Sequence, residues 1–394
     1  MSTIPWGDTQ ELNDDQFYNR NEEINSLLRF LRTTEEEIAP NLLLTGIRSI
    51  GKTVFLKKIK RSLDEDYLVV YMDFSKAECY QNNHMSINGI LNHYYTEIMN
   101  ECEQKDIKTI NEKIKKYLKT HNFSVQDIKT TQIPLPIINS EEDLNKLKDF
   151  VFNLPEKIYE NCKNDIKGVI ILIDEFQIIK ELGEYKDSFL WVLRSYIQNQ
   201  NNVAYVFTGS MSLHDTLIYE IAGKQGAFGG RMLTIELKEF SVDTTRNYLN
   251  EKADYLKFTD EGFKTFYKYT SGIPAYINIF AKLLPPNEEL TKSKIEEEFK
   301  NSLSALAGDL INVWNRLTLK EKNIIITLLD KAKRRKDIAK ELNVTSGSLS
   351  VALNKLQDLM LIYYENDRYI LSEPLLALWL KNKYIEKGNY PYRT

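Results

Sequence analysis

The fold is decided by one stretch of the chain, Asn41-Leu42-Leu43-Leu44-Thr45 followed by Gly46-Ile47-Arg48-Ser49-Ile50-Gly51-Lys52-Thr53. The first part is an apolar run typical of a buried strand, and the second has the form GxxxxGK[ST]. The residues that follow have a helical pattern of apolar side chains, at Val54, Phe55, Leu56, Ile59 and Leu63. Glycines let successive backbone N–H groups face phosphate oxygens, and the next helix adds its positive N-terminal end. The stretch therefore predicts a phosphate-binding loop for a nucleotide.

The residue types in this loop predict separate roles. We expect Lys52 to reach the β- and γ-phosphates, and Thr53 to give a hydroxyl to Mg²⁺, because a hard cation prefers oxygen ligands. The residues that we expect to bind the nucleotide here are Gly46, Ile47, Arg48, Ser49, Ile50, Gly51, Lys52, Thr53 and Val54.

A second apolar run, Val169–Ile173, ends in the adjacent carboxylates Asp174 and Glu175. Neighbouring residues of a strand point to opposite faces, so the two acids can do different work at the mouth of a sheet. We expect Asp174 to hold Mg²⁺ and Glu175 to polarise the water that attacks the γ-phosphate. The alternative is that the pair only caps the next helix. The phosphate loop favours the catalytic interpretation.

Composition narrows the class of protein. A chain of 394 residues with 42% hydrophobic content is long enough for two or three domains, and its net charge of −4 argues against a chain that coats nucleic acid along its whole surface. The three cysteines, Cys79, Cys102 and Cys162, have no metal or disulfide spacing. We find no signal peptide pattern and no run of eighteen apolar residues, which predicts a cytoplasmic protein without membrane contact.

Strand and helix patterns alternate from about residue 40 to 240, which predicts a parallel α/β sheet. The expected strands are Leu42–Thr45, Tyr67–Phe74, Val169–Asp174, Val203–Thr208 and Met232–Leu237. We expect an α/β ATPase domain over residues 1–240, with an insertion at 75–165 of several Lys- and Glu-rich helices, broken by a turn at 132–136. A helical domain over 241–310 and a third domain over 311–394 would follow, with one small β signal near the C-terminus.

Two further positions are candidates for the site. The strand that ends in Thr208-Gly209-Ser210 would lie between the loop strand and the Asp174 strand if the sheet is of the additional-strand type. Thr208 or Ser210 could then sense the γ-phosphate, although Ser210 is equally well explained as the N-cap of a helix over 213–221. Arg231, which follows Gly229-Gly230, could stabilise transition-state charge in cis or in trans, or be a surface arginine.

The order of these motifs resembles the archaeal-type ATPase family, a branch of the STAND group that is related to AAA+ proteins and replication initiators. The residues that carry the resemblance are Phe17–Ile24, the loop, Asp174–Gln177, Thr208–Ser210, Gly230-Arg231 and Ser271-Gly272-Ile273-Pro274. The resemblance implies that the segment around Arg20 packs over the adenine base and that Pro274 opens a lid helix near the nucleotide. No arginine follows Gly272 where AAA+ lids usually carry one.

The C-terminal part has the pattern of a winged helix-turn-helix. Three helices are expected at Leu319–Asp330, Arg335–Leu342 and Ser346–Met360, and a two-stranded wing at 361–364 and 368–371. The third helix offers polar residues for a DNA groove, Ser346, Ser348, Ser350, Asn354 and Lys355. A basic patch lies beside it, made of Lys331, Lys333, Arg334, Arg335 and Lys336. The alternative is a packing or protein-docking module, because the third helix is poor in arginine.

Taken together, the sequence predicts a parallel-sheet P-loop NTPase with a helical lid and a C-terminal winged helix. We expect it to bind ATP and Mg²⁺ and to hydrolyse ATP slowly without a partner, as a switch. One interpretation is that it associates with double-stranded DNA through the winged helix and could assemble there as a homo-oligomer. The other is a signalling or defence switch of the STAND type, whose winged helix docks a protein partner.

Overall fold

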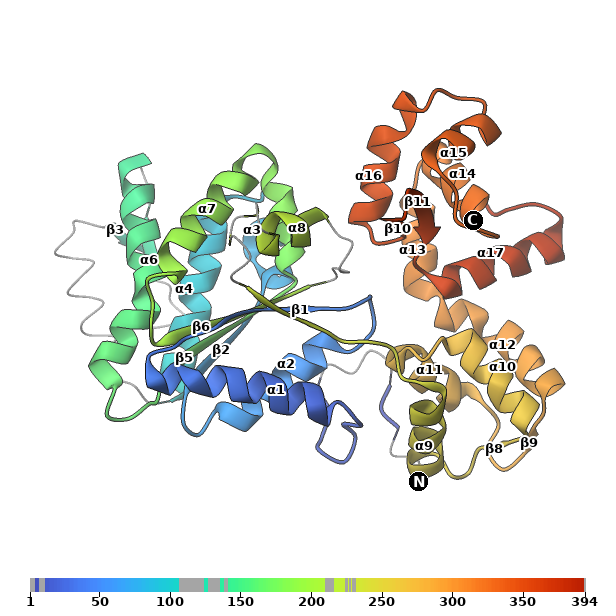
Figure 1. Cartoon of the computed structure of the whole chain (residues 1–394), viewed down its shortest axis with the longest axis horizontal. Helices are drawn as coiled ribbons and strands as arrows, with labels where there is room; N and C mark the ends of the chain where they lie inside the picture. The colour runs from blue at the N-terminus through green and yellow to red at the C-terminus, as the bar shows by residue number, and fades with distance from the viewer. Residues whose placement is uncertain are drawn as a thin grey trace.

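The N-terminal half of the chain is built on a parallel five-stranded sheet (Figure 1). The computed structural model describes residues 4–6, 11–105, 124–126, 135–137, 141–209, 216–223, 226, 228 and 232–392. The strand order is β2-β5-β6-β1-β7, with all neighbours parallel. Because β6 lies between β1 and β5, the additional-strand order predicted from the sequence is confirmed. The strands are β1 Asn41–Thr45, β2 Leu68–Asp73, β5 Val169–Asp174, β6 Val203–Thr208 and β7 Leu233–Glu236.

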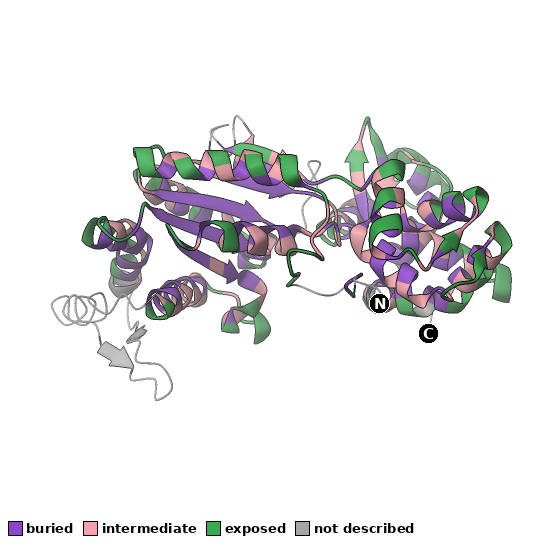
Figure 2. Ribbon diagram, turned by 90° about the horizontal axis from the view of Figure 1, so that it is seen from below, coloured by how far each residue is buried: buried purple, intermediate pink, exposed green. Residues whose placement is uncertain are grey.

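Helices cover both faces of this sheet, and β1, β2, β5 and β6 are buried along nearly their whole length, whereas the edge strand β7 is partly exposed (Figure 2). Along β1, Leu42 and Leu44 join one core while Leu43 joins the other, as the two-residue period of a strand requires. One face carries α1 Asn21–Arg32 and α2 Lys52–Leu63, and the other carries α4 Ile87–Gln104, α6 Glu141–Cys162, α7 Lys186–Ile197 and α8 Thr216–Ala222. This burial on both faces leaves only the strand ends to form a site.

The insertion after β2 departs from the sequence prediction in one detail. Its main elements are helices, as expected, and α4 and α6 pack against the sheet with a buried apolar face. The turn expected at 132–136 is wrong at its end, because Leu135–Ile137 forms a short strand, β4, paired antiparallel with β3 Ser124–Gln126. Pro136 is tolerated there because a two-stranded ribbon has edges that need no N–H donor. Residues 132–134 lie outside the described residues.

Smaller elements complete the sheet half. The strand expected to reach Phe74 ends at Asp73, because the Asp73 side chain accepts from the Ser75 N–H and hydroxyl and starts a short helical turn, η2 Phe74–Lys76. A four-residue helix, α3 Glu78–Gln81, follows it. After β5 the chain forms η3 Phe176–Tyr185. An additional turn, η1 Thr33–Glu36, follows α1.

The C-terminal half is helical, with two small β elements rather than one. The lid region holds α9 Val242–Lys252, α10 Asp260–Thr270, α11 Pro274–Leu283, α12 Lys292–Leu306 and α13 Gly308–Arg316. The structure also has a parallel pair of two-residue strands, β8 Lys257–Phe258 and β9 Glu289–Leu290. This pair was not predicted from the sequence, because two residues are too few to show the alternation of apolar and polar side chains that marks a strand. None of the helices in the described part of the chain is long and apolar enough to cross a bilayer.

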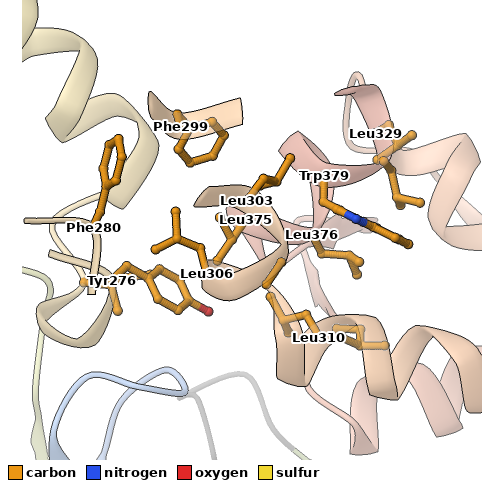
Figure 3. Close-up of a cluster of buried hydrophobic side chains, with 14 of the residues drawn as sticks. Tyr276, Phe280, Phe299, Leu303, Leu306, Leu310, Leu329, Leu375, Leu376 and Trp379 are labelled. Atoms are coloured by element: carbon orange, nitrogen blue, oxygen red, sulfur yellow. The ribbon is translucent and has the colours of Figure 1, made fainter. Parts of the chain in front are cut away.

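A winged helix follows, as predicted. It comprises α14 Leu319–Leu328, α15 Arg335–Glu341, η4 Gly347–Leu349, α16 Ser350–Asp358, the hairpin β10 Ile362–Glu365 with β11 Arg368–Leu371, and α17 Pro374–Lys387. Its apolar residues form one continuous cluster with those of the lid, in which Tyr276 and Phe280 of α11, Leu303 and Leu306 of α12, and Trp379 of α17 pack together (Figure 3). The lid and the winged helix therefore share a core.

Candidate nucleotide site

The loop between β1 and α2 has the backbone that its glycines require. Gly46 has φ 148° and Gly51 φ 97°, and a Cβ on Gly46 would lie 2.8 Å from the Leu237 carbonyl oxygen. Ser49 also adopts a positive φ, of 64°. The loop ends at Gly51, which caps α2, so the N-terminal N–H groups of that helix face the space outside the sheet. This geometry is an anion-binding cradle.

The Lys52 side chain folds back toward the start of the phosphate loop. Its Nζ donates to the carbonyl oxygens of Gly46 and Ile47, each at 2.8 Å, and its side chain is buried. Burial lowers the pKa of Lys52 to about 8, against the attraction of Asp174 and Glu175. A buried ammonium that is held by two neutral carbonyls is poorly compensated, so a polyanion placed in the loop would be strongly favoured by it.

Thr53 and Asp174 meet at the end of β5. The Thr53 Oγ1 donates to Asp174 Oδ2 at 2.6 Å, and the Tyr71 hydroxyl donates to the same oxygen at 3.0 Å. Burial raises the pKa of Asp174, while the hydrogen bonds from Thr53, the Glu175 N–H and Tyr71 oppose the change. The pair brings one hydroxyl and one carboxylate together beside Lys52. That oxygen set suits Mg²⁺ together with nucleotide phosphates.

Glu175 follows the strand with a left-handed backbone, at φ 54°. Its Oε2 accepts from the Gln177 amide at 2.6 Å, and burial raises the pKa of the carboxyl, against that hydrogen bond. The Gln177 amide lies close to Gly209, just after β6. A Cβ on Gly209 would lie 2.0 Å from Gln177 Oε1, so a larger residue at this position would displace the Gln177 amide. Glu175 and Gln177 both line the cleft that contains Lys52 and Thr53.

Of the two residues predicted to sense the γ-phosphate at the end of β6, Thr208 is described by the structure. The Thr208 hydroxyl is buried and donates to the Leu44 carbonyl oxygen at 2.7 Å, so its proton already joins β6 to β1. Ser210 and Arg231 lie outside the described residues. The helix expected over 213–221 is described as α8 from Thr216, which leaves the capping interpretation of Ser210 untested.

A cavity opens on the other side of the loop, and Arg20 and Pro274 both line it. Arg20 is buried, stacks on the Phe240 ring with its guanidinium carbon 5.2 Å from the centroid, and donates to the Lys238 carbonyl oxygen. Pro274 is the first residue of α11 and follows Gly272, whose φ is 71° and whose Cβ would lie 2.2 Å from the Phe240 carbonyl oxygen. The lid is thereby joined to the end of the sheet beside the loop.

The winged helix also reaches the loop. Glu373, at the start of α17, is buried, and its Oε2 accepts from the Tyr276 hydroxyl at 3.0 Å. Burial raises the pKa of the Glu373 carboxyl to about 7, against that hydrogen bond and the positive charges of Arg48 and Lys52. A second link is the ion pair of Lys180 with Asp358, at 2.9 Å, from η3 to the end of α16. Lys355 and Met360 line the same cleft as Lys52.

These features define a P-loop nucleotide site of the additional-strand kind, and comparison with known proteins gives the family. Residues 17–280 match the model of an ATPase domain found predominantly in Archaea. The match covers most of the chain, which therefore belongs to this family of P-loop ATPases. Residues 313–361 match the CENP-B N-terminal DNA-binding domain.

Relatives and solved structures agree with this assignment. An uncharacterised ATP-binding protein of Methanocaldococcus jannaschii is 26% identical, over 82% of this chain and 86% of that protein, and a second one is 22% identical over 91% and 93%. The Walker-type ATPase of Pyrococcus abyssi has the same fold, with a TM-score of 0.62 at 16% identity over 94% of this chain and 98% of that one. The ORC2 protein of Aeropyrum pernix gives 0.51 at 12% identity, over 94% and 96%.

Several residues near the site were not singled out from the sequence. Tyr71 and Asp73 belong to β2, whose end lies next to Asp174 in the sheet, and the rule that strand ends meet at one edge could have found them. Glu373, Tyr248 and Asn278 approach the loop only through the packing of the lid and winged helix. No local pattern marks them.

Proposed function

We propose that this chain is a cytoplasmic ATP-binding and ATP-hydrolysing switch that reports its nucleotide state through the winged helix. The observation that carries the proposal is the meeting of Thr53 with Asp174, at 2.6 Å, beside the buried Lys52 and with Glu175 at the same cleft. The ATPase family of the chain and its ATP-binding relatives support ATP as the nucleotide. Residues 1–240, 241–310 and 311–394 would act as the ATPase domain, lid and winged helix.

In this proposal Lys52 leaves the carbonyls of Gly46 and Ile47 and binds the β- and γ-phosphates. Thr53 and Asp174 would hold Mg²⁺, which supplies positive charge to the phosphates when it is bound. Glu175 accepts a proton from the water whose oxygen attacks the γ-phosphorus, while the bond to the ADP oxygen breaks. Gln177 orients Glu175 through its amide.

Two predicted site residues remain part of the proposal without a described position. Ser210 would sense the γ-phosphate, and Arg231 would stabilise charge in the transition state, in cis or from a neighbouring copy. A trans-acting arginine requires a homo-oligomer. If Arg231 acts in trans, mixing Arg231→Ala with Lys52→Ala chains should restore turnover, because some interfaces then combine an intact loop with an intact arginine.

The switch would be read out at the cleft itself. The Glu373 carboxylate lies near Arg48 and Lys52 and is attracted by their positive charges. Bound phosphates would be attracted by the same two side chains. Asp358 of α16 holds Lys180, which follows the Glu175 strand in η3. Phosphate binding at the loop therefore competes with a contact made by the winged helix, which gives a route from ATP to the position of α16.

We propose double-stranded DNA as the partner, through α16 and its neighbours, and the match to a DNA-binding domain supports this. A protein partner is the second candidate, because part of the basic patch is already paired. Lys333 forms an ion pair with Glu341, and Arg334 with Asp367 at 3.2 Å. On α16, Val351 is 81% exposed, which suits an apolar contact better than a DNA groove.

ATP turnover measured with and without double-stranded DNA, over a series of salt concentrations, tests the function and its partner. We expect slow turnover of the isolated chain, a rise on adding DNA, and a steep loss of DNA binding as salt increases. Turnover that ignores DNA, with no salt-dependent binding, would favour the protein partner. The absence of any turnover under all of these conditions would contradict the proposed hydrolysis.

A further inference from the structure

The cavity beside the phosphate loop is aromatic and is assembled from parts of the chain that are distant in sequence. Gly51 and Val54 of the loop and α2 form one end of it. The rings of Tyr18, Phe240 and Tyr248 contact one another there, with Tyr18 and Tyr248 centroids 5.0 Å apart. An apolar, aromatic cavity that begins where the phosphates would end is suited to a flat nucleotide base.

Two polar side chains that line this cavity form a hydrogen bond with each other. The Tyr248 hydroxyl of α9 donates to Asn278 Oδ1 of α11 at 2.7 Å, and both residues are buried. This bond fixes which end of the amide is the acceptor, and it commits the hydroxyl proton. Among the described residues no oxygen accepts from the Asn278 amide nitrogen. Both of its N–H groups therefore remain for a ligand, next to a free lone pair on the Tyr248 oxygen.

A donor beside an acceptor matches adenine. The 6-amino group of adenine donates, and the ring nitrogens on either side of it, N1 and N7, accept. Guanine presents an acceptor, O6, in place of the amino group, and its N1 carries a hydrogen. A guanine in the same position would leave buried polar groups without partners or facing like groups, which is the costly case.

We propose that Tyr248 and Asn278 select adenine over guanine, with the Asn278 amide donating to a ring nitrogen and the Tyr248 oxygen accepting from the 6-amino group. The inference rests on the proposed nucleotide function and names what sets its base specificity. Arg20 lies in the same cavity but is not the reader of the base. Its guanidinium already donates to the Lys238 carbonyl and lies over the Phe240 ring, so it supports the wall on which the base would stack.

The experiment measures the dissociation constants of Mg-ATP and Mg-GTP for the full chain, by displacement of a fluorescent ATP analogue. The variants are Asn278→Asp, which turns the donor into an acceptor while keeping the shape, and Tyr248→Phe, which frees the amide to turn over. The control is Tyr267→Phe, because Tyr267 donates to the Phe240 carbonyl at 3.0 Å and is another lid hydroxyl near the site. The ratio of the two constants is the readout, since a general weakening of binding cancels in it.

We expect the wild-type chain and Tyr267→Phe to favour ATP by roughly tenfold or more. Asn278→Asp should bring GTP to equal or tighter binding, and Tyr248→Phe should lower the preference several-fold. A ratio unchanged in both variants, with ATP binding still dependent on Lys52, would overturn this inference and leave the proposed function standing. Failure of the wild-type chain to bind either nucleotide would overturn both. Thermal melting of each variant establishes that it is folded, and where only one variant folds, the ratio measured for that variant decides.

Discussion

The two ends of the nucleotide cleft are built in different ways. The phosphate end is one continuous loop, Gly46–Thr53, joined by the end of β5, which lies two strands away from β1 in the sheet, and its interactions are those of charged groups. The base end combines Tyr18–Arg20, Phe240–Tyr248 and Pro274–Asn278, and its chemistry is aromatic surface with one oriented hydrogen bond. In the proposed function the first end would bind any nucleoside triphosphate, whereas Tyr248 and Asn278 of the lid would select the base at the second end.

This difference separates two kinds of defect. A change at the phosphate end should alter the affinity for every nucleotide by the same factor, because all of them carry the same phosphates. A change at the base end should alter the ratio between nucleotides. Because the lid supplies α9 and α11, a movement of the lid would open the base end and leave the loop intact.

The largest change in binding is expected from Lys52→Ala. The loop would lose a buried ammonium that makes charge-assisted hydrogen bonds to phosphates, at a cost of about 3 kcal/mol or roughly a hundredfold in affinity. ATP and GTP should weaken equally, as measured by equilibrium titration. Lys58→Ala, which removes a lysine paired with Asp14 on the outer side of α2, is the control. A change in the ATP to GTP ratio would contradict the separation of the two ends.

The next effect concerns the carboxylate that the winged helix places near the loop. The pKa of Glu373 is raised by burial from an ordinary 4.5 to about 7, so the folded chain favours the protonated form. The protonated Glu373 carboxyl therefore makes its full contribution to the free energy of unfolding at low pH. This contribution is lost as the pH rises from 4.5 to about 7, and the free energy of unfolding falls by about 3 kcal/mol at most. Glu373→Gln should melt like the wild-type chain at pH 5 and at a higher temperature at pH 8.

The exposed lid carboxyl Glu289 gives the control for this series, as Glu289→Gln. Its melting temperature should follow that of the wild-type chain at both pH values. A Glu373→Gln variant whose advantage is the same at pH 5 and at pH 8 would show that the Glu373 carboxyl does not titrate between these values. Glu373 would then not link the winged helix to the phosphate end through its charge.

A tenfold effect is expected from pH at the phosphate end. Because burial lowers the pKa of Lys52 to about 8, ATP binding above that pH must first restore the proton. The dissociation constant should rise roughly tenfold between pH 7 and pH 9, with proton uptake visible as a dependence of the binding heat on the buffer. The same slope for GTP would sharpen the comparison. A constant affinity from pH 7 to pH 9 would rule out a lowered pKa.

The smallest effect is expected at the contact of α16 with the sheet half. Asp358→Asn removes a partly exposed ion pair with Lys180, worth up to about 1 kcal/mol, and should slow the release of ATP and GTP alike by a few-fold, because it weakens the winged-helix contact that would compete with phosphate. Stopped-flow release of a fluorescent nucleotide measures it. Asp330→Asn, which breaks the Lys381 pair within the winged helix, should leave release unchanged. Equal rates of nucleotide release from Asp358→Asn and Asp330→Asn would show that the contact made by α16 has no effect on the cleft.

Much of the fold was predictable because its signals are local. The loop, the strand that ends in Asp174 and the winged-helix hairpin each show their period within about ten residues, and the structure has all three. The place of β6 between β1 and β5 was predicted on the condition that the sheet is of the additional-strand type, and the structure has that order. The error at Pro136 arose because proline marks turns and ribbon edges equally.

The residues of the candidate site also divide into those with a local sequence signal and those without one. Lys52, Thr53 and Asp174 meet as the motifs predict, since one loop and one strand end fix their places. Tyr248, Asn278 and Glu373 carried no local signal, because each is brought in by the packing of α9, α11 or α17 on a shared core. The roles of Ser210 and Arg231 stay predictions.

The measurement that tests the central claim most directly is phosphate release from saturating Mg-ATP by the wild-type chain and by Glu175→Gln. Gln keeps the shape of the side chain and loses its ability to take a proton, so turnover should fall by a factor of roughly a hundred or more while ATP binding is kept. That result would place the chemistry at the end of β5. Turnover by Glu175→Gln at the wild-type rate would contradict it and reduce Glu175 to a helix cap.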